Sequence, residues 1–346
     1  MRFSEEVDLG FVFIGTLVGA GFASGQEIML FFTRYGRNGL TGLLLSCLLF
    51  FASGYLILKH AIRLQSSSLR DILQPLVGKK FMSWIETILY AYLFIGFYIM
   101  LAGSAAVLKQ CFDLPYTPCS FLLCMLCVGW LTKGVRGLAD FNEVIVPVMM
   151  ILMVLISYYG IRGYGSMKAI MLAAAPGHQG WWLSALLYFS YNMTSMSVVL
   201  ASLGKYTRRK QAALGAAAIS GVGVFVMALG PYLLTTAYFD RMSMVEIPLL
   251  AIARISAPAF YWGAAFILLS AMLTTALSYG YALASDLSSR INWGYRKTLL
   301  ILALGWPFAT ARFSKLVATI YPLFGIIGIF FTGIIILRRF FRIKLE

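Results

Sequence analysis

The sequence predicts an all-α integral membrane protein of about ten transmembrane helices. Of its 346 residues, 60% are hydrophobic and only 12% are charged, whereas a soluble domain carries roughly 25% charged residues. Apolar runs recur from Leu9 to Leu337, and most are long enough to cross a hydrocarbon core of about 30 Å. The chain therefore lacks the polar surface that a water-soluble domain needs.

The positions of the Lys and Arg residues indicate how the chain crosses the membrane. They lie between the apolar spans or at their ends, and a cytoplasmic N-terminus places 19 of the 28 on the cytoplasmic side. This bias follows the positive-inside rule and places both termini in the cytoplasm. The net charge of +15 is thus a topology signal, and we expect no nucleic-acid partner. The predicted spans are 9–32, 38–58, 81–108, 117–132, 141–160, 181–203, 211–236, 258–285, 297–311 and 316–337.

The ten spans divide at the Gly163–Gly180 loop into two halves, 9–160 and 181–337. Because each half has an odd number of spans, the halves cross the membrane in opposite senses, as inverted-topology repeats do. We therefore expect residues 1–346 to form a single transmembrane domain. The segment Met242–Ser256 is too short to span, and we expect a surface or re-entrant helix there that helps to close an external vestibule.

The first span contains four glycines, at positions 15, 19, 21 and 25, within eleven residues. One interpretation is close helix packing through G-x-x-x-G pairs. The other is a helix broken near Val18–Gly21, whose free backbone groups at Gly19, Ala20 and Gly21 bind a ligand. The polar residues Ser24, Gln26 and Glu27 directly after the glycines favour the broken helix.

Glu27 lies about 10 Å outward of the centre of the first span, at the rise of an α-helix. An ionisable side chain within the hydrocarbon region indicates a functional site by default. Three roles stay open for Glu27: contact with a substrate amine, proton transfer, or a carboxyl group that its neighbours neutralise for structural reasons.

The stretch LVGAGFASGQE, residues 17–27, resembles the YkvI-like group of bacterial membrane proteins. That group is similar to the amino acid–polyamine–organocation (APC) superfamily, whose members share the LeuT fold. The resemblance implies a multi-pass protein of the bacterial inner membrane with a 5+5 inverted repeat. It also implies that helices 1 and 6 are interrupted at mid-membrane and hold the substrate between them.

The eighth span carries the hydroxyl pair that the resemblance associates with a sodium ion. Ala271, Thr274 and Thr275 match the helix 8 part of that motif, and Gly15 and Val18 match its helix 1 carbonyl donors. The alternative is that the threonine hydroxyls bond only to carbonyls of their own helix. Proton-coupled relatives place a lysine from helix 5 at this position, and residues 141–160 contain no lysine, which favours sodium.

The sixth span has a polar cluster near its centre, with Ser190, Asn192 and Thr194 as candidate substrate ligands. Such a cluster needs partners from other helices or from a ligand. The resemblance predicts a second helix break here, although the span contains neither Gly nor Pro. Tyr98, near the middle of the third span, matches an aromatic residue that covers the substrate, and ordinary packing is the alternative.

These observations predict a secondary transporter rather than an enzyme. We expect alternating-access transport of a small zwitterionic solute such as an amino acid, coupled to sodium and without a further cofactor. A proton-coupled or uncoupled exchanger and a non-transporting sensor or assembly protein of the same fold are the alternatives. No clustered acid–base residues and no nucleotide-binding or hydrolase motif indicate a catalytic site. The expected partners are the solute and membrane lipid.

Overall fold

The computed structural model describes residues 5–66, 68–133, 138–165, 170–171, 177–205, 207, 209, 211–290 and 294–342, and all regular secondary structure within these ranges is helical. The elements are α1 (Glu5–Leu17), α2 (Ala20–Ser24), α3 (Gln26–Phe31), η1 (Thr33–Tyr35), α4 (Asn38–Leu64), α5 (Leu69–Val77), α6 (Lys79–Phe112), α7 (Tyr116–Leu131), α8 (Leu138–Tyr164), α10 (Trp181–Leu203), α11 (Ala212–Ala237), α12 (Phe239–Met242), α13 (Pro248–Ser256), α14 (Pro258–Arg290), α15 (Tyr295–Leu304), η2 (Trp306–Thr310) and α16 (Phe313–Arg342).

Seven helices in the described part of the chain are long and apolar enough to cross a membrane: α4, α6, α8, α10, α11, α14 and α16. The fourth predicted span is the shorter apolar helix α7. The ninth predicted span, 297–311, is not one helix. It consists of α15, which ends at Gly305, and the 3-10 helix η2, which has Pro307 in its first turn. Proline lacks the N–H group that a continuing α-helix requires, so α15 stops there.

The first span is broken, as predicted. Helix α1 ends at Leu17, and Gly19 has an extended backbone conformation with φ −90° and ψ −177°. The chain then forms the short helix α2 and turns again at Gly25, whose φ of +84° lies in the left-handed region that favours glycine. The glycines therefore interrupt the helix rather than merely allowing close packing.

The predicted break in the sixth span is wrong. Residues 181–203 form the single helix α10, without interruption. The hydroxyl groups of this span bond to carbonyls of their own helix, as Ser190 does to Leu186 at 2.7 Å and Thr194 to Ser190 at 2.9 Å. Because neither Gly nor Pro weakens the backbone ladder, polar side chains alone do not break the helix.

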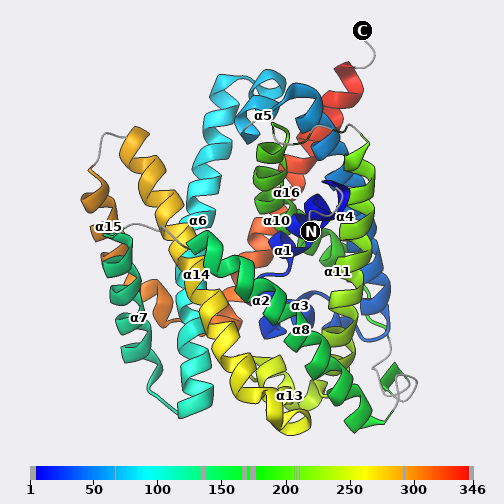
Figure 1. The fold of residues 1–346 in the computed structure, drawn as a ribbon, viewed down its shortest axis with the longest axis vertical. Helices are drawn as coiled ribbons and strands as arrows, with labels where there is room; N and C mark the ends of the chain where they lie inside the picture. The colour runs from blue at the N-terminus through cyan, green and yellow to red at the C-terminus, as the bar shows by residue number, and fades with distance from the viewer. Residues whose placement is uncertain are drawn as a thin grey trace.

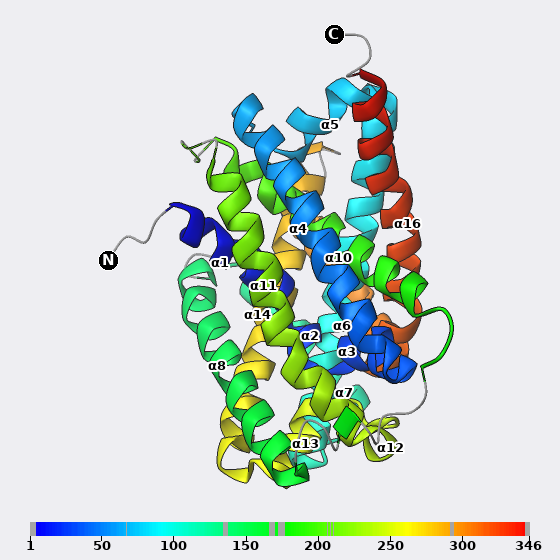
Figure 2. The same ribbon diagram turned by 90° about the vertical axis from the view of Figure 1, so that its right-hand side faces the viewer.

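The long helices form one bundle around the broken span (Figures 1 and 2). Helix α6 packs along α14, α10 packs between α4 and α16, and α1 packs on α11. Helix α5 and the C-terminus lie at one end of the bundle, and α12 and α13 lie at the other (Figure 2). The predicted short helix within 242–256 is α13, and it buries Leu249, Leu250 and Ile252 against the bundle.

Candidate functional site

Glu27 is buried in the centre of the bundle, on the first turn of α3. Only 5% of its surface is exposed, and its carboxylate accepts a hydrogen bond from the hydroxyl of Tyr191 on α10. The carboxylate also lies against Gly21 of α2, where an added methyl group would overlap it and come within 3.3 Å of the Tyr321 hydroxyl. The absence of a side chain at Gly21 therefore lets the carboxylate reach the backbone beside the break.

Five tyrosines, which we call the tyrosine cluster, lie near Glu27 and contact one another in two groups. They are Tyr92 of α6, Tyr188 and Tyr191 of α10, Tyr279 of α14 and Tyr321 of α16. The rings of Tyr191 and Tyr321 stack with centroids 4.7 Å apart, and Tyr188 meets Tyr191 edge-on at 5.8 Å. Tyr92 and Tyr279 contact each other at 6.0 Å and are only partly buried. The cluster thus surrounds one acidic group with aromatic rings and hydroxyls.

No Lys, Arg or His side chain forms an ion pair with Glu27 among the residues that the structure describes. Glu86 shows the contrast: it lies near the end of the bundle that carries α5, and Arg70 donates two hydrogen bonds to it, at 2.8 and 2.9 Å. A buried carboxylate without a cation is costly unless a proton or a cationic ligand neutralises it. The centre of the bundle therefore favours either a protonated Glu27 or a positively charged ligand beside it.

The other predicted residues of the first span lie at the break itself. Gly19 is partly exposed, and an added Cβ would meet no atom within 4 Å, so its backbone faces open space. Ala20 and Gly21 are buried on α2. Ser24 donates a hydrogen bond to the Gly21 carbonyl at 2.6 Å and accepts one from the Gln26 amide at 3.2 Å. Its side chain stabilises the turn between α2 and α3.

The remaining predicted substrate residues lie elsewhere. Tyr98 donates a hydrogen bond to the carbonyl of Leu302 on α15 at 2.9 Å and packs against Phe308, so Tyr92 is the α6 tyrosine next to Glu27. Ser190 and Thr194 face α16, where Gly328 allows close approach. The Asn192 amide donates to the Tyr188 carbonyl at 3.1 Å within α10. Each of these groups has a hydrogen-bond partner within the protein, and their contact with a substrate stays a prediction.

The structure shows the surroundings of the candidate sodium ligands on α14 and on α1. Thr274 and Thr275 both donate to the Ala271 carbonyl, at 3.1 and 2.7 Å, which is the helix back-bonding considered above. A hydroxyl that donates in this way keeps lone pairs that can accept a cation. Gly15 lies next to Val146 of α8, and Val18 is fully buried just before the break. A sodium site between these two groups stays a prediction.

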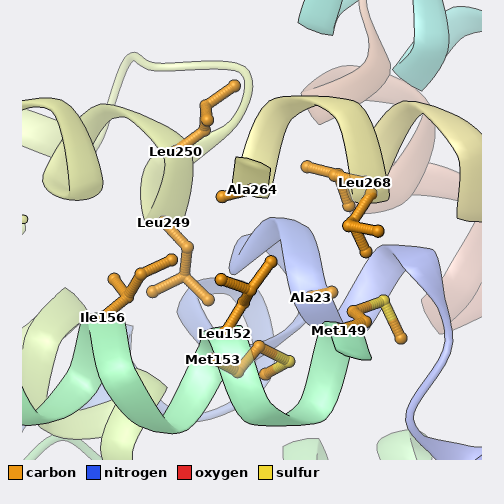
Figure 3. Close-up of a pocket in the computed structure, with 10 residues that line it drawn as sticks. Ala23, Met149, Leu152, Met153, Ile156, Leu249, Leu250, Ala264 and Leu268 are labelled. Atoms are coloured by element: carbon orange, nitrogen blue, oxygen red, sulfur yellow. The ribbon is translucent and has the colours of Figure 1, made fainter. Parts of the chain in front are cut away.

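Two cavities lie away from Glu27. The first is lined only by apolar residues of α2, α8, α13 and α14, with Ala23, Met149, Leu249 and Leu268 among them (Figure 3). The second, of about 230 Å³, is lined by α6, α10 and α16, and Thr194 is its one polar residue. Neither cavity offers a charged group, so neither is suited to a charged solute.

The fold defines the class of protein. The structure resembles Mhp1 in its inward-facing conformation with a TM-score of 0.60 and 13% identity, over 96% of this chain and 75% of that one. It resembles MhsT in complex with L-phenylalanine with a TM-score of 0.59 and 15% identity, over 92% and 80%. The described part of the chain is thus an all-helical membrane protein with the LeuT fold, and Mhp1 is a transporter of the nucleobase-cation-symport-1 family.

The sequence comparison places the chain beside two uncharacterized proteins of Bacillus subtilis (strain 168). It is 29% identical to YyaD in an alignment 330 residues long that covers 92% of each chain. It is 24% identical to the membrane protein YkvI over 332 residues, or 96% of this chain and 95% of that one. No family model matches. The chain is a homologue of YkvI and YyaD, as the motif in the first span indicates, and a multi-pass membrane protein with bacterial relatives.

Most of the tyrosine cluster was not predicted from the sequence. Tyr188 and Tyr191 belong to the polar stretch of the sixth span, but Tyr92, Tyr279 and Tyr321 were not singled out. One signal was available: each of these tyrosines places a hydroxyl group inside an apolar span, where polar groups need partners. That signal does not say which of the many tyrosines meet.

Proposed function

We propose that the protein is a secondary transporter that moves a small zwitterionic solute, such as an amino acid, by alternating access. The observation that carries this proposal is the break between α1 and α2, which lies in a buried core beside Glu27. Irregular backbone at membrane depth is tolerated where it is buried or lines a cavity, and half-helices at a substrate site are a recurring feature of secondary transporters. The L-phenylalanine bound to MhsT supports a solute of this size.

Three pairs of helix contacts support two inverted repeats, 9–160 and 181–337. If α1, α4, α6, α7 and α8 correspond in order to α10, α11, α14, α15 and α16, the packing of α1 on α11 is matched by α10 on α4, α6 on α16 by α14 on α8, and α6 on α7 by α14 on α15. The extensive packing of α10 on α16 has no match of comparable extent between α1 and α8 in the described part of the chain, so the two halves are not packed symmetrically.

Sodium coupling is part of the proposal, with the ion held by carbonyls at Gly15, Val18 and Ala271 and by the hydroxyls of Thr274 and Thr275. Carbonyl and hydroxyl oxygens suit a hard cation. Helix α14, which carries the threonines, packs against α2 just beyond the break. An ion between these elements would join the broken span to α14 and stabilise one arrangement of the two halves.

Uptake by the reconstituted protein tests both amino-acid transport and sodium coupling. We expect uptake of radiolabelled amino acids into proteoliposomes, driven by an inward sodium gradient and absent with potassium alone. The double variant Thr274→Ala and Thr275→Ala should lose sodium-dependent uptake while inserting normally, because α14 keeps its buried face. Absence of flux for every amino acid in the wild type would refute the transporter, and unchanged sodium dependence in the double variant would refute the ion site.

Glu27 favours one alternative, a proton-coupled exchanger. A buried carboxyl group without a cationic partner can bind a proton on one side of the membrane and release it on the other side when the protein changes conformation. Uptake driven by an imposed proton gradient in sodium-free buffer would establish this alternative. Uptake that ignores the proton gradient and follows sodium would exclude it.

A further inference from the structure

The tyrosine cluster contains an unsatisfied hydrogen-bonding group on α10, the helix that also carries Tyr191, the partner of Glu27. The Tyr188 side chain is fully buried, and its hydroxyl is one of two buried side-chain oxygens without a hydrogen-bond partner in the described part of the chain. Buried polar groups in native proteins are normally hydrogen-bonded, so an exception calls for an explanation. The neighbouring Tyr191 hydroxyl is already used by Glu27, which leaves Tyr188 as a free acceptor in the centre of the bundle.

The charge and the aromatic surfaces around that free acceptor are complementary to one type of group. Glu27 supplies a buried carboxyl group without an ion-pair partner among the described residues, and a nearby cation favours the ionised form of such a group. The faces of the surrounding tyrosine rings attract cations, most strongly where water is excluded. The free hydroxyl accepts a hydrogen bond from an N–H donor. An ammonium group satisfies all three features, whereas a carboxylate or a phosphate would be repelled by Glu27.

A purely structural role explains the cluster less well. A buried acid that only stabilises packing is usually paired, as Glu86 is with Arg70 in this protein. Phenylalanine would fill the space of Tyr188 without a buried hydroxyl, since the ring already packs on Phe31 at 5.4 Å and Phe32 at 4.8 Å. The chain instead retains both costly groups, and it does so from two different helices, α3 and α10.

We infer that Glu27 and the tyrosine cluster bind the protonated amino group of the transported solute. This inference rests on the proposed function and narrows the substrate to primary amines and amino acids. The site holds no ligand position at Glu27 in this structure, because the Tyr191 hydroxyl is hydrogen-bonded to the Glu27 carboxylate. An entering ammonium group takes the place of that hydroxyl and also donates to the Tyr188 hydroxyl. The open space beside Gly19 lies at the break in the same span, and the rest of the solute extends toward it.

Binding measured without transport tests this inference. Purified full-length protein is heated in detergent with each L-amino acid, with the amine that lacks its carboxylate, and with the acid that lacks its amino group. For phenylalanine these are phenethylamine and 3-phenylpropanoate. We expect stabilisation by one or more amino acids and by the matching amines, and none by the deaminated acids, because ligands that bind the folded state raise its melting temperature. N,N,N-trimethyl derivatives, which lack N–H donors, should bind more weakly than the free amines.

Three variants separate binding from structure. Glu27→Gln keeps the shape of the side chain and should weaken amine binding about tenfold to hundredfold, the range for a lost charged hydrogen bond. Tyr188→Phe should weaken it about threefold to tenfold while leaving the melting temperature of the ligand-free protein unchanged or higher, since its hydroxyl has no partner. Tyr98→Phe is the matched control outside the cluster, and its amine affinity should equal that of the wild type.

Equal stabilisation by amino and deaminated compounds, stabilisation by none of the amines, or wild-type amine affinity in both Glu27→Gln and Tyr188→Phe would overturn the inference. If Glu27→Gln does not fold, Tyr188→Phe alone decides. The result is also distinguishable from failure of the proposed function. Amine binding without flux in proteoliposomes would refute transport and keep the ammonium site. Flux that amino acids and deaminated acids inhibit equally would keep transport and refute the ammonium site.

Discussion

Gly21→Ala perturbs the contact between the break and Glu27 more selectively than any change to the acid itself. The new methyl group would overlap the Glu27 carboxylate, lie 3.1 Å from its Cδ atom and 3.3 Å from the Tyr321 hydroxyl. The carboxylate must therefore move, and its hydrogen bond with Tyr191 is lost or rebuilt. Loss of a hydrogen bond to a charged group costs about 1.5–3 kcal/mol, and overpacking costs about 1–3 kcal/mol.

Alanine is favoured over glycine in a helix by about 1 kcal/mol, which offsets part of this cost, so loss of the hydrogen bond together with overpacking should lower the free energy of unfolding of Gly21→Ala by about 1.5–5 kcal/mol. Gly19→Ala is the matched control for stability, because a Cβ there meets nothing within 4 Å and its φ of −90° suits alanine. Denaturant titration in detergent is measured for both variants. Equal stability of the two variants would refute the placement of Glu27 against Gly21.

Two further predictions concern the ends of the bundle. Gln26→Ala removes hydrogen bonds of 2.6 and 2.9 Å to the carbonyls of Val245 and Glu246, so we expect amide hydrogen exchange in residues 245–256 to accelerate; unchanged exchange would show that Gln26 does not hold this segment. Arg70→Ala leaves Glu86 buried without its bidentate partner and should lower the free energy of unfolding by about 1.5–3 kcal/mol. Addition of Glu86→Gln should recover part of that loss, and a double variant no more stable than Arg70→Ala would contradict the ion-pair explanation.

The two predicted helix breaks show which interruptions of a helix can be predicted from local sequence. The break in the first span follows from glycines at positions 19 and 25, because the first is extended and the second has a positive φ. The predicted break in the sixth span depended on its polar residues and on the resemblance. Polar side chains can bond to their own helix, as Thr194 does to Ser190, and so they leave the backbone intact.

The ninth predicted span also shows that the residues within an apolar run decide whether it forms one helix. Hydropathy predicts a span over 297–311, but Gly305 and Pro307 end the α-helix after ten residues. Both residues were visible in the sequence, but Pro147, Pro231 and Pro322 lie inside continuous helices, so a proline alone does not predict a stop. An apolar run therefore indicates burial in protein or lipid, and the backbone chemistry within the run decides whether it is one helix.

The sequence by itself determined that this protein is helical and crosses a membrane, because apolar run length and the positions of Lys and Arg are local properties. It also located the broken first span and singled out Glu27, since glycines and a carboxyl group in an apolar run are visible without a structure. Only the tertiary structure decided what surrounds Glu27. Tyr92, Tyr279 and Tyr321 come from three helices far apart in the chain, and Tyr98 points to α15 instead. Which residues meet across a bundle depends on the rotation and crossing of whole helices, and helices that are apolar on nearly every face leave no periodic pattern to predict it.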